Sequence, residues 1–300
     1  MLGIVVDLGY VAAQTANALF YSSILFLIAS GLSLIFGIMR VLNLAHGAFY
    51  MVGAYVMYTV FTRLVSGAEV GVVAGILAAG LVLAAIGYLV EVGLLKWVYS
   101  KPEEVQLLLT FALILVFDDT VKIIWGTEYK ALQSIPWGSF RVGEYLIPVY
   151  YIVTVAVAVV VAFGLWIMFT RTITGKKIRA AASYPDIAAA LGVNTRILFS
   201  LTFALGAALA GISGAMAAPI LTAYPGMGTE AIVLSFAIIV IGGMGSILGS
   251  FIGALIVGFS RTFMAIVYPV LEIALVYIVM ALILIIKPTG LFGEREVERR

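Results

Sequence analysis

Cysteine is absent from the 300 residues, and charged residues make up only 11% of them. The first absence excludes disulfides, thiolate metal sites and cysteine nucleophiles, although it identifies no compartment. The scarcity of charge argues against a soluble domain, in which about a quarter of the residues are charged. Because 64% of the residues are hydrophobic and the mean hydropathy is +1.19, most of the chain is expected to lie in a lipid bilayer. The net charge of +2, without a basic cluster beside stacking aromatics, gives no sign of a nucleic-acid partner.

Catalytic and nucleotide-binding motifs are also missing. The chain has one histidine, His46, which cannot make a usual zinc site without cysteine and has no nucleophile placed beside it. No phosphate-binding loop of the form G-x-x-x-x-G-K-[ST] occurs, since Gly175-Lys176-Lys177 lacks the upstream glycine and the hydroxyl. We therefore expect no catalytic residues, no metal and no cofactor in this chain. If ATP powers it, another subunit binds the ATP.

Long apolar runs predict an all-α transmembrane bundle of eight or nine segments, since roughly 20 apolar residues cross a bilayer. Glycines disfavour a continuous helix at GGMGS, 242–246, so the charge-free run 231–260 is expected to break into two pieces. All 300 residues are expected to form one transmembrane domain. The expected segments are 11–36, 44–64, 71–95, 104–125, 145–170, then three or four in 197–287, including 230–243, 246–264 and 267–287.

The distribution of basic residues predicts the orientation in the membrane. Loop 171–196 has five basic residues against a single acid, Asp186, so the positive-inside rule places this loop in the cytoplasm. Counting spans then puts the N-terminus outside and the basic C-terminal tail inside. The first ten residues lack a basic n-region and carry Asp7, so we expect them to be retained rather than cleaved as a signal peptide.

A short helix is predicted within that loop. Pro185 suits a first helical turn, and Asp186 complements the positive end of the helix dipole. Ala189 and Leu191 continue the helix, and Gly192 suits the position just after it. A helix of about two turns is unstable alone in water, so it needs a surface to rest on. That surface is either the membrane or another protein.

Polar groups lie inside the apolar stretch VLNLAHGAFYMVGAYV, 41–56. Asn43 and His46 are three residues apart and would share a face of a helix, while Gly47 allows a close backbone approach and Tyr50 follows one turn later. Unsatisfied polar groups in lipid are costly, so these residues are expected to face a protein-lined interior. There they either line a solute path or satisfy local backbone groups.

Glycines interrupt the C-terminal half of the chain. Gly242, Gly243 and Gly245 permit a bend at membrane depth, which either presents helix ends to a solute or packs helices closely. The small-residue run at 206–216 is expected to pack helices.

A few charged residues stand near the expected ends of the segments. Asp118 and Lys122 are spaced for an ion pair on one helix. Glu230 follows loop 222–229 and is expected to be an exposed loop acid, whereas Glu272 is expected to pair or to reach the interface.

Four stretches together resemble a known family. They are GLSLIFGIMRVLNLAHGAFYMVGAYV, RAAASYPDIAAALGVNTRILFSLTFALGAALAGISGAM, IVIGGMGSILGSFIGALIVG and KPTGLFG, in this order over nearly the whole chain. They resemble signatures of the LivH-type permease subunits of branched-chain amino acid ATP-binding-cassette importers. Ala48 departs from the acid that the family often has after His-Gly, while the Asn43–His46–Gly47 pattern favours the LivH type over the LivM-type sister subunit.

The resemblance implies a subunit of an importer in the prokaryotic cytoplasmic (inner) membrane. Its implied partners are a second permease subunit (a LivM-type sister or a second copy), two cytoplasmic ATPase subunits that bind the ATP, an extracytoplasmic solute-binding protein and membrane lipid. The helix Pro185–Leu191 would dock on an ATPase subunit. Branched-chain or other hydrophobic amino acids would cross by alternating access.

Two alternatives stay open. Related permeases carry urea, short amides or other small solutes, and the shared motifs do not separate these. An ion-coupled secondary transporter would need paired ionisable residues inside the membrane, of which the span centres offer little beyond His46.

Overall fold

The computed structural model describes residues 8–65, 69–132 and 137–293. Asp7, on which the expectation of a retained N-terminus rests, and the basic tail beyond residue 293 lie outside the described residues. Within these ranges the chain is mainly helical, as the hydropathy predicts. The α-helices are α1 (Leu8–Met39), α2 (His46–Thr59), α3 (Glu69–Gly93), α4 (Glu103–Trp125), α5 (Val149–Arg171), α6 (Ile173–Ser183), α7 (Pro185–Ala190), α8 (Thr195–Leu221), α9 (Met227–Gly242), α10 (Ile247–Val267) and α11 (Glu272–Ile286).

Short elements extend some of these helices. A π-helical turn continues α2, and single 3₁₀ turns follow α3 and precede α11. Their bounds are Val60–Leu64, Leu95–Trp97 and Pro269–Leu271.

Six helical stretches in the described part of the chain are long and apolar enough to cross a membrane. They are α1, α3 with the 3₁₀ turn after it, α5, α8, α10, and α11 with the 3₁₀ turn before it. The count of eight or nine segments is therefore not confirmed. Helices α2 and α9 have only 14 and 16 residues, and α4 carries two acids in its first turn and charges near its end. A polytopic helical bundle is nevertheless what the structure contains.

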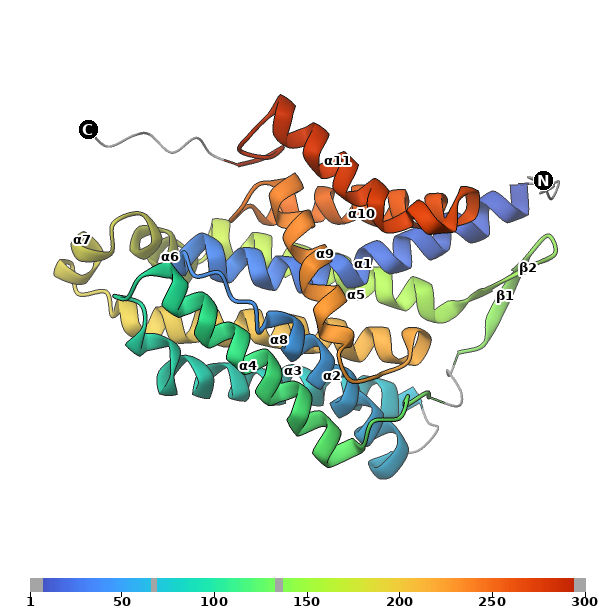
Figure 1. The fold of residues 1–300 in the computed structure, drawn as a ribbon, viewed down its shortest axis with the longest axis horizontal. Coiled ribbons are helices and arrows are strands. Elements are labelled where there is room, and N and C mark those ends of the chain that lie inside the picture. Colours follow the sequence, from blue (N-terminus) through green and yellow to red (C-terminus); the bar gives the residue numbers. More distant parts are fainter. Residues whose placement is uncertain (1–7, 66–68, 133–136, 294–300) are drawn as a thin grey trace.

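Several of the long helices have their axes roughly parallel or antiparallel to one another. Figure 1 shows α1, α5, α8 and α10 running along the long axis, while α9 crosses them steeply. Helix α8 packs against α1, α2 and α3, and α1 packs against α8 and α10. The short helices α6 and α7 lie at one end of the bundle, opposite the β-hairpin.

A two-stranded hairpin is a departure from the all-α expectation. Strands β1 (Ser139–Val142) and β2 (Tyr145–Pro148) pair antiparallel, with Phe140 opposite Ile147. Gly143 takes a φ of +62° in the two-residue turn, a conformation that glycine adopts without strain. The segment expected at 145–170 therefore begins as a strand, and its helix α5 starts only after the extended Pro148.

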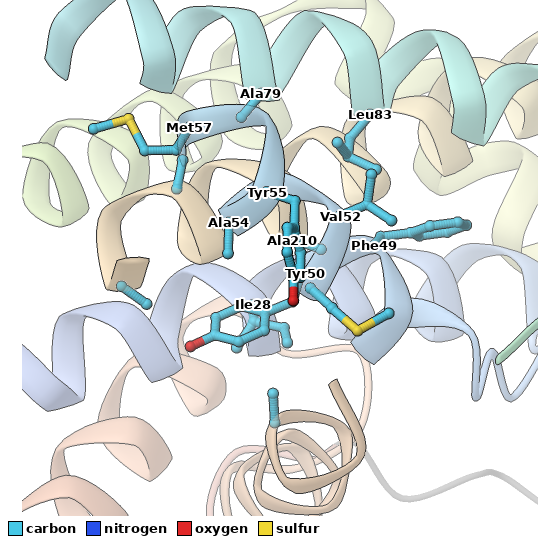
Figure 2. Close-up of a cluster of buried hydrophobic side chains, with 14 of the residues drawn as sticks. Ile28, Phe49, Tyr50, Val52, Ala54, Tyr55, Met57, Ala79, Leu83 and Ala210 are labelled. Carbon is cyan, nitrogen blue, oxygen red and sulfur yellow. The ribbon is translucent and has the colours of Figure 1, made fainter. Parts of the chain in front are cut away.

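The core surrounds α2, whose side chains are buried on nearly every side (Figure 2). Small residues let its neighbours approach. A Cβ on Gly211 would lie 2.7 Å from the Cβ of Leu83, and one on Gly214 would overlap the carbonyl oxygen of Tyr50. The run 206–216 therefore packs α8 against α3 and α2, as predicted.

Candidate functional site

The chain enters α2 through a non-helical segment, residues 40–45. Arg40 has a φ of +53°, which ends α1, and α2 begins only at His46. Asn43 therefore lies outside the helix, and the prediction that it shares a helix face with His46 is wrong. The Asn43 carbonyl instead accepts a hydrogen bond from the His46 N–H at 3.3 Å. Both residues are fully buried in protein, as expected.

His46 joins the start of α2 to the middle of α1. Its Nε2 lies 3.0 Å from the carbonyl oxygen of Ile28, to which it donates as the tautomer protonated on that nitrogen. Gly31 makes room for the ring, since a Cβ there would lie 3.0 Å from Cε1 of His46. This geometry gives His46 a structural role in holding two helices together.

Gly47 and Tyr50 are three residues apart near the start of α2, so they lie on the same face of this helix. Gly47 packs directly on Gly228 of α9, and a Cβ on either glycine would overlap the other's carbonyl oxygen. Tyr50 extends from α2 toward Ile28 (Figure 2). Gly47 therefore sets a helix crossing, whereas the Tyr50 side chain reaches a cavity.

The glycine break, residues 242–246, is a tight turn that is hydrogen-bonded to the segment after α11. Gly243 and Gly245 have φ values of +103° and +83°, so only glycine fits them without strain. Helix α9 ends at Gly242 and α10 begins at Ile247, which places the break where the sequence predicts it. The N–H of Leu291 donates to the carbonyl of Ile241 at 2.9 Å. Two of the four signature stretches, GGMGS and KPTGLFG, thus form one structural unit.

The basic loop folds into two helices rather than one. Pro185 occupies the first turn of α7 with Asp186, and Gly192 has a φ of +83° just after the helix. The N–H of Val193 donates to the carbonyl of Ala188 at 3.0 Å, which forms a Schellman motif. Helix α6 was not predicted; the Thr172 hydroxyl caps it by accepting from the N–H of Gly175.

Helix α7 exposes apolar side chains at the tip of the bundle. Ile187 is 58% exposed and Leu191 is 80% exposed, whereas Ala188 is buried and Ala189 is exposed. These exposed apolar side chains could rest on either of the two expected surfaces, the membrane or another protein.

Arg261 is a residue that the sequence analysis did not single out. It lies near the end of α10 and pairs with two carboxylates: Nη2 is 2.7 Å from Oε1 of Glu230 and 3.1 Å from Oε1 of Glu272. Its guanidinium also lies 4.8 Å from the ring centroid of Tyr21 and donates to the Tyr21 hydroxyl. A charged residue inside the predicted segment 246–264 was itself a signal for such a cluster.

This ion cluster corrects the expectation for Glu230. Glu230 lies in the first turn of α9 and is ion-paired, not a free loop acid, while Glu272 pairs as expected. The expected pair of Asp118 and Lys122 also forms, at 2.5 Å.

The cluster borders a cavity of about 180 Å³ between α1, α2, α9 and α10. One part of its wall is polar and the other aliphatic. Burial raises the pKa of the Tyr224 hydroxyl and the Glu230 carboxylate raises it further, so Tyr224 stays a neutral hydrogen-bond donor. The polar lining is Tyr21, Tyr50, Tyr224, Glu230 and Arg261, and the apolar lining is Ile24, Leu25, Ile28, Leu221, Met227, Ala231 and Leu234.

A second, larger cavity of about 560 Å³ lies between α1, α5, α6 and α10. Its lining is mostly apolar and includes Gly245 from the glycine break. Of the sequence-predicted residues, Tyr50 thus reaches the first cavity and Gly245 the second. Asn43, His46 and Gly47 reach neither, and Gly242 and Gly243 do not line them.

Known proteins resemble this chain over nearly its full length. It is 30% identical to the high-affinity branched-chain amino acid transport system permease protein LivH of Escherichia coli (strain K12), over 97% of this chain and 98% of that protein. It is 29% identical to the corresponding protein BraD of Pseudomonas aeruginosa, over 95% of this chain and 97% of BraD. A solved structure, PsaBC from Streptococcus pneumoniae in complex with Fab, superposes with a TM-score of 0.48 at 14% identity, covering 91% and 90% of the two chains.

The family described as "Branched-chain amino acid transport system / permease component" matches residues 14–287. This range runs from α1 to the end of α11 and contains the broken entry to α2, the basic loop and the glycine break. The chain therefore belongs to the family of permease components of branched-chain amino acid transport systems.

Proposed function

We propose that this chain is the membrane-spanning permease subunit of an ATP-binding-cassette importer for branched-chain or other hydrophobic amino acids. The observation that carries the proposal is the family match over residues 14–287, with relatives of that printed function aligned over nearly their full length. Its partners are a second permease subunit, two cytoplasmic ATPase subunits and an extracytoplasmic solute-binding protein. Residues 1–300 act as one transmembrane domain in the prokaryotic cytoplasmic membrane.

The subunit is a transporter and not an enzyme. ATP is bound and hydrolysed by the ATPase partners, and this chain needs no cofactor of its own. The absence of a phosphate-binding loop from the sequence supports this division of labour.

The proposed orientation places α6 and α7 in the cytoplasm and the β-hairpin outside. The basic residues of loop 171–196 support it through the positive-inside rule. Adding α2, α4 and α9 to the six long helices gives nine segments, which takes the N-terminus outside and the C-terminus inside. In agreement with this count, α11 runs toward the same end of the bundle as α7 (Figure 1).

Helix α7 couples the ATPase cycle to the membrane helices. Ile187 and Leu191 insert into a groove of an ATPase subunit, and closure of the ATPase dimer displaces α7. The displacement reaches α8 directly, because only residues 191–194 separate the two helices. Alternating access follows when the bundle tilts about a path shared with the second permease subunit.

Uptake by the reconstituted complex tests the function. We would co-express the permease pair with its ATPases, place them in proteoliposomes, supply the binding protein and measure labelled leucine and urea. Leucine uptake that requires both ATP and the binding protein is expected. Urea uptake alone would change the solute but keep the mechanism, whereas uptake without ATP would favour an ion-coupled transporter.

The docking role of α7 has its own test. Leu191→Glu introduces a charge at the proposed contact and should abolish ATP-driven uptake while the complex still inserts in the membrane. Ile173→Glu is a matched control, because Ile173 is an exposed apolar residue of the same loop outside α7. Equal uptake by both variants would contradict the docking proposal.

A further inference from the structure

The cavity beside Arg261 combines features that a small zwitterion needs. Its volume of about 180 Å³ is smaller than the ~300–1,000 Å³ of pockets that hold drug-sized ligands. A molecule of the size of a free amino acid suits such a space. The polar part of the wall offers both a guanidinium and a carboxylate, and the aliphatic part offers leucine and isoleucine side chains from α1, α8 and α9.

The charges are arranged unevenly around this cavity. Arg261 and Glu230 line it, whereas Glu272 does not. Glu272 accepts from Nε of Arg261 at 3.1 Å, so it balances the guanidinium from outside the cavity. The three groups together carry one net negative charge, which favours a ligand with an ammonium group over a simple anion.

Glu230 is accessible to a ligand. Its side chain is 45% exposed, and its Oε1 is the atom paired with Arg261. The Tyr50 side chain lines the same cavity as Glu230 and Tyr224. Loop 222–226, which joins α8 to α9, contributes Tyr224 to the same wall.

We propose that this cavity is a weak binding site in the permease for a free aliphatic α-amino acid. The ammonium group of the ligand faces Glu230, its carboxylate faces Arg261 and the tyrosine hydroxyls, and its side chain lies against Ile24 and Leu234. The proposal rests on the proposed function for its substrate class. It adds a site that selects for the zwitterion after the binding protein has released it.

A purely structural role for the ion cluster makes a different prediction. Arg261 joins α9 to α11 through Glu230 and Glu272, and a structural staple would depend on both carboxylates alike. Of these two acids, a ligand site depends mainly on Glu230, because Glu272 does not line the cavity. The two acids therefore form a matched pair for testing.

The experiment uses the complete importer in nanodiscs without the binding protein, and measures equilibrium binding of labelled leucine. Glu230→Gln should weaken leucine binding by about tenfold to a hundredfold, as expected for loss of a charged hydrogen-bond partner. Glu272→Gln removes a charge that does not line the cavity, so it should weaken leucine binding much less than Glu230→Gln does. The 2-oxo acid analogue of leucine, which lacks the ammonium group, should not compete. Equal weakening in both variants, or competition by the oxo acid, would overturn the site.

A second pair of variants tests the cavity without changing charge. Ala231→Phe fills the cavity, while Val233→Phe adds the same side chain at an exposed position of α9 that does not line it. In proteoliposomes with ATP and the binding protein, Ala231→Phe should lose leucine uptake and Val233→Phe should keep it. Equal uptake by the two variants refutes the site but leaves the function standing. Failure of the wild-type importer to take up leucine refutes the proposed function instead.

Discussion

Replacing Gly47 with alanine should destabilise the crossing of α2 and α9. The added Cβ would overlap the carbonyl oxygen of Gly228 and would lie 2.8 Å from the Cβ of Ile232. Atoms in good contact are about 3.5–4.0 Å apart, so the two helices would have to separate by roughly 1 Å. The overlapped atom belongs to the backbone, and a change of side-chain rotamer cannot relieve the clash.

Two opposing effects set the size of the stability change in Gly47→Ala. Alanine is a better helix former than glycine by about 1 kcal/mol, which favours the variant. Overpacking a tight core costs about 1–3 kcal/mol and leaves the helices misaligned. Gly164→Ala, in the interior of α5, isolates the first effect, because a Cβ there meets nothing within 4 Å. We therefore expect Gly47→Ala to be less stable than Gly164→Ala by about 1–3 kcal/mol.

Thermal unfolding of the two purified variants in the same detergent measures this difference. Gly228→Ala should resemble Gly47→Ala, and the double variant should lose less than the two single losses combined, since both methyl groups open the same contact. Melting temperatures for Gly47→Ala equal to or above those of Gly164→Ala would refute the close-packing argument.

Three further substitutions have direct readouts. His46→Ala removes the bond to Ile28 and leaves a void, so stability should fall by about 2–3 kcal/mol in thermal unfolding, and a wild-type melting temperature would contradict it. Gly192→Val strains a left-handed residue by about 1–2 kcal/mol, so ATP-driven uptake should drop at normal membrane abundance; full uptake would argue against α7 as the coupling element. Tyr150→Phe removes the 2.8 Å hydrogen bond to the Met216 carbonyl, so the free energy of unfolding should fall by about 0.5–1.5 kcal/mol. Thermal unfolding measures this loss, and an unchanged melting temperature would show that the bond does not stabilise the fold.

Local chemistry explains what could be predicted from the chain. The length of the apolar runs reveals a membrane protein, and the stereochemistry of Gly243 and Gly245 marks the break between α9 and α10. Pro185 and Gly192 bound α7 for the same reason, because each has a backbone preference that does not depend on distant residues. The order of the four signature stretches was enough to indicate the family.

Predictions of where a helix begins and of which residues share its face were less successful. Asn43 was expected to share a helix face with His46 because the two are three residues apart, but α2 begins only at His46. Residues 145–148 were counted as membrane helix, although they pair with β1. In both cases the backbone turns locally, at Arg40 and at Gly143, within a hydrophobic pattern that is compatible with a helix.

The ion cluster around Arg261 is the clearest example of a feature that the sequence alone could not predict. Composition, hydropathy and glycine stereochemistry already indicate a helical membrane protein with a broken C-terminal half and a short helix in a basic loop, because each follows from a residue and its near neighbours. Arg261 meets Tyr21, which is 240 residues away in the chain, and Glu230 on another helix. Only the packing of α1, α9, α10 and α11 brings these groups together, since the face that a helix presents depends on the helices around it.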